Sequence, residues 1–225
     1  MQIVSLSFGR FQELSDLDIF FRHSFLRLKL VLDISVPENT EFDFDKIHKD
    51  ISDFFPNLQK HKCWANLLGG SISNRERKDL PFQRVGGITD LAHLVEHMII
   101  DLQATVGQME SCSGLTCGYQ DPANRFDLFI ECKDRRVATF SSNLAVKMMK
   151  ELLWDKNLSF EYSKLIQLAK CLYSEPELIF SLQKLSQKLG WQKEELALQI
   201  RELIGLKFLN KEFLLSNSVK RRGKK

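Results

Sequence analysis

Residues 89–107 read TDLAHLVEHMIIDLQATVG, and residues 126–132 read FDLFIEC. The first segment predicts a long helix, because Thr89 or Asp90 can cap its amino terminus and Gly107 can end it. In the second segment Asp127, Phe129 and Glu131 share one face of a strand and four apolar residues share the other, because side chains alternate along a strand. These two segments predict a fold that combines helices with a sheet.

The flanking segments extend this pattern. Residues 25–34 (FLRLKLVLDI) alternate like a strand, and residues 43–55 and 139–154 have apolar residues at helical spacing. Residues 69–87 contain two Gly-Gly pairs and residues 111–125 are rich in turn-forming residues, so both are expected to be loops. The sequence thus predicts an α+β fold, in which helices cover a mainly antiparallel sheet.

The carboxy-terminal part has a different, mostly helical pattern. Helical spacing is found in residues 160–173, 176–190 and 192–204, and a small hairpin is expected over residues 207–215. Two short helices joined by a turn at Gly190 and followed by a β wing predict a winged helix-turn-helix.

Three parts of the chain follow from these patterns. We expect an α+β domain over residues 1–156, a winged-helix-like domain over residues 157–216 and a basic disordered tail over residues 217–225. The exposed face of the 192–204 helix would carry three acids and two bases, which would be repelled by DNA phosphates. A role in packing or in binding a protein partner is therefore favoured over DNA binding for this part.

Composition and charge exclude several classes of protein. The chain has 225 residues, of which 44% are hydrophobic and 27% charged, as in ordinary globular proteins. The net charge is +3, but residues 220–225 carry five positive charges, so the preceding residues sum to −2. This balance disfavours a protein that coats nucleic acid. No apolar run is long enough for a membrane span, no signal peptide is evident, and the five cysteines are scattered, so we expect a cytoplasmic protein with reduced thiols.

The motif with chemical meaning is H-x-x-E-H, formed by His93, Glu96 and His97 inside the predicted helix. Residues at i, i+3 and i+4 share one face of a helix, so both imidazoles can reach one ion. In the inverted zincin arrangement the two histidines bind Zn²⁺ and the glutamate is the general base. One zinc ion per chain is therefore expected.

A catalytic zinc site takes a third protein ligand from elsewhere in the chain. Glu131, at the end of the 126–132 strand, is the expected ligand, and Asp127 on the same strand face is the reserve candidate. Asp101 lies one turn beyond His97 and is placed to accept a hydrogen bond from an imidazole.

A solvated polar face that carries two histidines is the alternative interpretation of this motif. Two observations favour a metal site. The chain has only five histidines, yet two of them are four residues apart. The helix around them is otherwise apolar, and burying polar groups there is costly unless they have partners.

Several segments together resemble the amino-terminal domain of cyanophycin synthetases. The matching segments are ITDLAHLVEHMIIDLQATVGQ, GLTCGYQDP and FDLFIEC, with FFRHSFLRLKLVLDI and FPNLQKHKCW upstream. The likeness covers roughly residues 1–150, and Arg22 and His23 match a pair at the entry to the first strand region. The H-x-x-E-H helix is also locally similar to the zinc-binding helix of pitrilysin-type metallopeptidases.

The resemblance implies a domain that binds cyanophycin, a polymer with an aspartate backbone and arginine side groups. It also implies a metallopeptidase-like site, with His93, His97 and Glu131 as metal ligands and Glu96 as the base. The chain departs from the family where Gly114-Leu115-Thr116 replaces a Gly-Arg-Thr turn. It has no glycine-rich phosphate loop, so we expect neither the ATP-grasp nor the Mur-ligase-like domain.

Two functions are consistent with the sequence. The first is a zinc-dependent hydrolase that cleaves a peptide or isopeptide bond in cyanophycin or a related polymer. The second is a non-catalytic polymer-binding or regulatory protein, whose winged-helix-like part recruits a protein partner or DNA.

Overall fold

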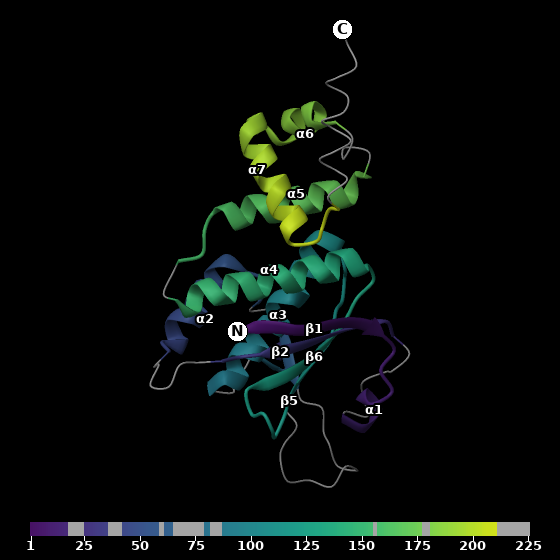
Figure 1. The fold of residues 1–225 in the computed structure, drawn as a ribbon, viewed down its shortest axis with the longest axis vertical. Helices are drawn as coiled ribbons and strands as arrows, with labels where there is room; N and C mark the ends of the chain where they lie inside the picture. The colour runs from purple at the N-terminus through teal and green to yellow at the C-terminus, as the bar shows by residue number, and fades with distance from the viewer. Residues whose placement is uncertain are drawn as a thin grey trace.

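The computed structural model describes residues 1–17, 25–35, 42–58, 61–64, 79–81, 87–154, 157–176 and 181–210. Within these ranges, four strands form an antiparallel sheet in the order β1-β2-β6-β5 (Figure 1). The strands are β1 (Gln2–Gly9), β2 (Arg27–Asp33), β5 (Gly114–Gly118) and β6 (Arg125–Glu131). The predicted α+β fold with an antiparallel sheet is confirmed.

The two faces of the sheet pack against different parts of the protein, because successive side chains along each strand point to opposite faces. Leu28, Leu30 and Leu32 of β2 point into the main hydrophobic core, where they meet the helices. Phe129 of β6 points the other way and packs with Leu14 of the short helix α1 (Leu14–Leu17).

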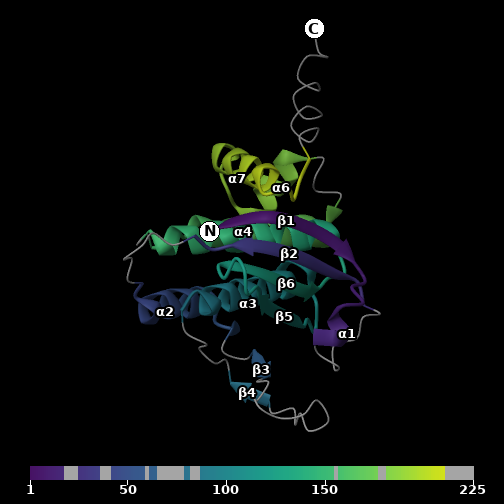
Figure 2. The same cartoon turned by 60° about the horizontal axis from the view of Figure 1, so that its bottom comes forward.

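The helical layer on the core side consists of α3 (Gly87–Gly107) and α4 (Arg135–Leu153). Figure 2 shows both helices behind the strands, with α2 (Phe44–Phe54) close to α3. Almost every residue of α3 from Asp90 to Gln103 is buried. The helix that carries the H-x-x-E-H motif is therefore enclosed, and its polar side chains need partners inside the protein.

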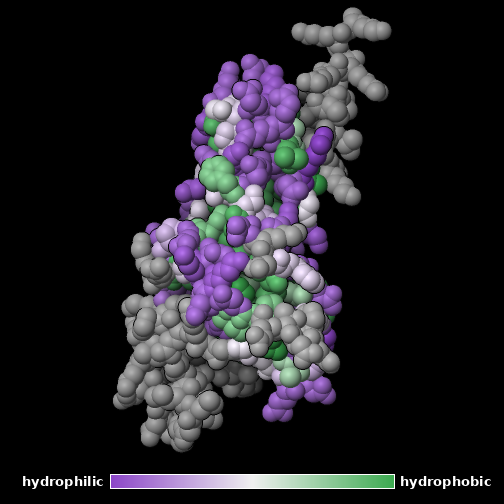
Figure 3. Space-filling model, turned by 90° about the vertical axis from the view of Figure 1, so that its left-hand side faces the viewer, coloured by the Kyte–Doolittle hydropathy of each residue, from purple (hydrophilic) through white to green (hydrophobic). Residues whose placement is uncertain are grey.

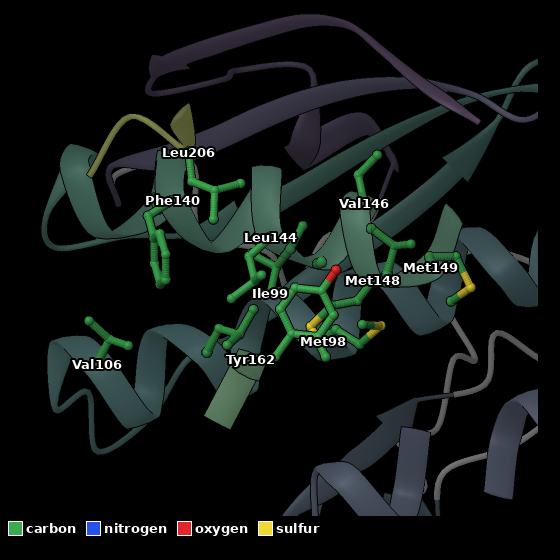
Figure 4. Close-up of a cluster of buried hydrophobic side chains, with 14 of the residues drawn as sticks. Met98, Ile99, Val106, Phe140, Leu144, Val146, Met148, Met149, Tyr162 and Leu206 are labelled. Atoms are coloured by element: carbon green, nitrogen blue, oxygen red, sulfur yellow. The ribbon is translucent and has the colours of Figure 1, made fainter. Parts of the chain in front are cut away.

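A second helical layer lies on the other side of α4 from the sheet (Figure 1). It contains α5 (Glu161–Ser174), α6 (Leu182–Leu189) and α7 (Lys193–Gly205). In Figure 4, Met98 and Ile99 of α3 lie near Leu144 and Met148 of α4, with Tyr162 of α5 beside them. One hydrophobic cluster thus joins the sheet, α3, α4 and the later helices. On the face in Figure 3, the upper part formed by these later helices is mostly hydrophilic.

Most predicted elements are present, with bounds shifted by a few residues. The helix expected to begin at Thr89 or Asp90 begins at Gly87, so that capping prediction is wrong; Asp90 is buried and contacts His48 of α2. Within residues 111–125, expected to be a loop, the chain forms β5.

Two short strands follow α2 and precede α3 in the sequence. They are β3 (Lys62–Trp64) and β4 (Asp79–Pro81), which pair antiparallel. Part of the loop predicted over residues 69–87 is therefore a strand, and most of its other residues lie outside the described ranges.

The winged-helix prediction is tested only in part. Its helices correspond to α6 and α7, and the left-handed Gly190 ends α6 as expected. Residues 206–209 are turn and bend, and residues 211–225, with most of the expected wing and the basic tail, lie outside the described residues. The same is true of Arg22 and His23. None of the helices in the described ranges combines the length and the hydrophobicity that a membrane crossing requires.

Candidate functional site

The H-x-x-E-H motif forms a compact group of possible metal ligands on α3. One ligand atom from each of His93, Glu96 and His97 lies within 4.8 Å of the other two. Within the described residues, these three side chains form the one group of three or more His, Cys, Asp or Glu residues that could hold a metal ion. The 3.6-residue period of the helix brings the three side chains to one face. The sequence-based expectation that they converge is met by the geometry.

The two imidazoles face each other through the nitrogens that would bind a metal. Nε2 of His97 lies 3.0 Å from Nε2 of His93. Two nitrogens on one tetrahedral zinc, each ~2.0–2.1 Å from the ion, are about 3.4 Å apart. The observed separation is close to this value, so the pair fits a zinc ion with small adjustment of the rings.

Burial keeps both rings neutral, which is the form that binds metal. It lowers the pKa of His93. For His97, burial and the neighbouring His93 and His61 lower the pKa to about 2. Neither ring therefore repels a cation by carrying a proton at neutral pH.

The carboxylate of Glu96 is held between α3 and β5. Thr116 of β5 donates a hydrogen bond from its hydroxyl to Oε2 of Glu96. Gly114 lies so close that a Cβ there would be 2.6 Å from Oε1 of Glu96. Burial raises the pKa of Glu96 to about 7, although the hydrogen bond from Thr116 acts in the opposite direction. A carboxylate with such a pKa can both accept and return a proton near neutral pH.

Two further residue pairs, His61–Asp101 and His48–Asp90, complete the polar cluster, and of these four residues the sequence predicted only Asp101 as a partner of an imidazole. Nδ1 of His61 lies 2.9 Å from Nδ1 of His97, and Nε2 of His61 lies 3.5 Å from Oδ1 of Asp101. At the other end of the cluster, Nε2 of His48 lies 2.5 Å from Oδ2 of Asp90.

The small number of histidines is the feature of the sequence that indicates this cluster of imidazoles. The chain has five histidines. The four in the described part of the chain all lie at α3 or touch it.

The structure does not bring Glu131, the expected third ligand, into the group around His93 and His97. Its carboxylate lies 3.5 Å from Arg27 on β2 and accepts a hydrogen bond from the backbone N–H of Ser113. On β6, Ile130 points into the core below α3, so its neighbour Glu131 belongs to the opposite face of the sheet. The ligand role of Glu131 stays a prediction, and this carboxylate has other partners here.

Asp127, the reserve candidate, also lies on the face away from α3. Its carboxylate is 2.9 Å from Nζ of Lys29 and accepts a hydrogen bond from the hydroxyl of Tyr119. Like Glu131, it is paired across the sheet rather than directed at the imidazoles.

Comparison with known proteins identifies the family of this region. No curated protein sequence matches the chain. A sequence model of the cyanophycin synthase-like N-terminal domain matches residues 27–154, which include α2, α3, β5, β6 and α4. The match contains every residue of the polar cluster and more than half of the chain. The chain therefore belongs to the cyanophycin synthase-like N-terminal domain family.

Proposed function

We propose that this chain is a metal-dependent hydrolase that cleaves a peptide or isopeptide bond in cyanophycin or a related polymer. Its family relates it to cyanophycin metabolism. The observation that carries the proposal is the convergence of two imidazole nitrogens and one carboxylate within 4.8 Å on a buried helix face.

The donor set fits zinc. Neutral imidazoles with a nearby carboxylate are ligands that zinc accepts, and His93 and His97 would hold the ion. When bound, zinc supplies Lewis acidity, which polarises a carbonyl and makes water more acidic near neutral pH. Glu131 is the third ligand that the family resemblance implies, and it would have to leave Arg27 and Ser113 to serve as one.

Glu96 is the residue that moves the proton. As the oxygen of water bonds to the carbonyl carbon, the carboxylate of Glu96 takes a proton from that water. As the C–N bond breaks, Glu96 returns the proton to the leaving nitrogen, and the products are a carboxylic acid and an amine. Thr116 fixes the orientation of the carboxylate through its hydrogen bond to Oε2.

The proposal is tested by incubating purified cyanophycin with the zinc-loaded protein and measuring the release of smaller fragments. Glu96→Gln removes the proton acceptor and is expected to lower the rate by about 10²–10⁴-fold, while the zinc content is retained. Glu194→Gln, at an exposed position on α7, is the matched control and is expected to cleave like the wild type. Cleavage that survives Glu96→Gln, or a wild-type protein that takes up no zinc, would contradict the proposal.

Polymer binding without cleavage is the second candidate function. The enclosure of Glu96 favours it, since this side chain is 4% exposed and lies behind Gly114 and Thr116. In that case the protein is retained on cyanophycin, the polymer keeps its length, and Glu96→Gln changes neither result.

A further inference from the structure

We infer that Asp101 and His61 together orient the lone pair of His97 Nε2 toward His93. The carboxylate of Asp101 lies 3.5 Å from Nε2 of His61, and Nδ1 of His61 is hydrogen-bonded to Nδ1 of His97. His61 is then a positioning residue of the metal site, supplied by the segment before β3. This inference rests on the proposed metal site, but the positions of the ring hydrogens on His61 and His97 can be measured in the protein without metal.

Four side chains contact one another in series, in the order Asp101, His61, His97 and His93. Asp101 is buried and lies at Nε2 of His61, Nδ1 of His61 lies at Nδ1 of His97, and Nε2 of His97 lies at Nε2 of His93. The rings of His61 and His97 have centroids 5.2 Å apart and are tilted by 31°. Each nitrogen of His97 therefore has its own imidazole neighbour.

The carboxylate of Asp101 decides which nitrogens carry hydrogen. A neutral imidazole has one N–H and one lone pair, and a carboxylate only accepts. The hydrogen of His61 therefore belongs on Nε2, facing Asp101, and its Nδ1 presents a lone pair. Nδ1 of His97 must then be the N–H that donates to His61. This leaves a lone pair on Nε2 of His97, which is the atom directed at His93.

The opposite placement of the ring hydrogens is unfavourable both at Asp101 and at the metal site. If Nδ1 of His61 donated to His97, the lone pair on Nε2 of His61 would face the carboxylate of Asp101. Nε2 of His97 would then carry hydrogen and could not bind a metal. Partners that fix the tautomer of a ligand histidine in this way typically contribute about 10–100-fold to metal affinity.

His61 acts through His97 rather than by binding the same ion itself. Its nearer nitrogen lies against Nδ1 of His97, and Nδ1 and Nε2 leave an imidazole ring in different directions. The ion between His93 and His97 would lie at the Nε2 edge.

Two measurements on the full chain test this inference. Long-range proton–nitrogen NMR correlations on ¹⁵N-histidine protein without metal report the tautomers directly; we expect N–H on Nδ1 of His97 and on Nε2 of His61. Zinc titration of His61→Ala should show about 10–100-fold weaker binding. His61→Gln should bind zinc within a few-fold of wild type, because its amide can accept from His97 and donate to Asp101.

The outcomes separate this inference from the proposed function. N–H on Nε2 of His97 in the metal-free wild type, or unchanged zinc affinity in His61→Ala, overturns the role of His61 and leaves the hydrolase proposal intact. Equal loss of affinity in His61→Gln and His61→Ala also overturns it. A wild type that binds no zinc but has the expected tautomers overturns the hydrolase proposal and supports the role of Asp101 and His61 in fixing the tautomer of His97.

Discussion

At the scale of single residues, the fit of Glu96 against Gly114 leaves no space for a methyl group. In Gly114→Ala the new Cβ would lie 2.6 Å from Oε1 and 2.8 Å from Cγ of Glu96, so the carboxylate must move. A displaced base is expected to lower cleavage by about 10²-fold, and overpacking is expected to lower the free energy of unfolding by about 1–3 kcal/mol. Cleavage assays and urea unfolding measure the two effects. Gly118→Ala, in the same strand, is the control because its Cβ approaches Phe126 only to 3.3 Å.

The ion pair between Asp33 and Arg125 makes part of the stability depend on pH. Arg125 donates to both carboxylate oxygens, at 2.7 and 2.9 Å, and these hydrogen bonds hold the pKa of Asp33 below its ordinary value. A carboxylate with a lowered folded-state pKa stabilises the fold above its unfolded-state pKa. This contribution is lost as the pH falls through the folded-state pKa.

Asp33→Asn is therefore expected to be less stable than wild type at pH 7 and to approach it in acid. Urea unfolding at several pH values measures the difference. A gap between the two proteins that stays constant down to strongly acidic pH would contradict the assignment.

Part of the site could be predicted from the sequence because it depends on one helix. The spacing of His93, Glu96 and His97 alone places them on one face. Alternation along the 126–132 strand likewise separates its two faces, but it does not say which face meets the helix. Glu131 is expected at the metal because it ends a strand after a turn that can fold back on the helix, and this reasoning does not fix the face on which its side chain lies. His61 could not be placed because its contact with His97 joins residues 36 apart in the chain.

At the scale of secondary structure, α4 depends on the residue that caps it. Asp134 accepts hydrogen bonds from the backbone N–H groups of Arg136 and Val137, at 2.7 and 3.1 Å. Asp134→Ala leaves these groups without this acceptor and is expected to lower the free energy of unfolding by about 0.5–2 kcal/mol. Asp134→Asn retains a capping oxygen and should remain near wild type in the same thermal or urea unfolding experiment. Equal losses in both variants would argue against the cap.

The elements that the sequence concealed are the two outer strands of the sheet. β5 (GLTCG) contains two glycines and few residues typical of strands, so its composition indicates a loop. In β1, the register shifts between Ile3 and Ser5, which interrupts the alternation expected of a strand. Both strands are specified by pairing with neighbours that bury leucines, and a local pattern does not contain this information.

At the scale of the whole molecule, the later helices share the core of the family-matched region. The match ends at residue 154, yet Phe208 packs edge-on against Phe140 of α4, with ring centroids 5.2 Å apart. Phe208 is 1% exposed, whereas Phe160 is 72% exposed. Phe208→Ala is therefore expected to lower the free energy of unfolding by about 3–5 kcal/mol, and Phe160→Ala by less than about 0.5 kcal/mol.

Because one hydrophobic cluster connects the sheet to α7, the loss in Phe208→Ala should extend to the metal-site end of the protein. Both proteins are prepared with Trp64 and Trp154 replaced by Phe, so that Trp191, between α6 and α7, is the remaining tryptophan. Urea unfolding monitored by hydrogen exchange at β6 and by the fluorescence of Trp191 should then give one shared transition in each protein. The midpoint should move to lower urea for both probes together in Phe208→Ala. If only the Trp191 transition moved and β6 kept its protection, the later helices would be a separate unit, and the packing of Phe208 on Phe140 would not stabilise the helix layer that holds His93 and His97.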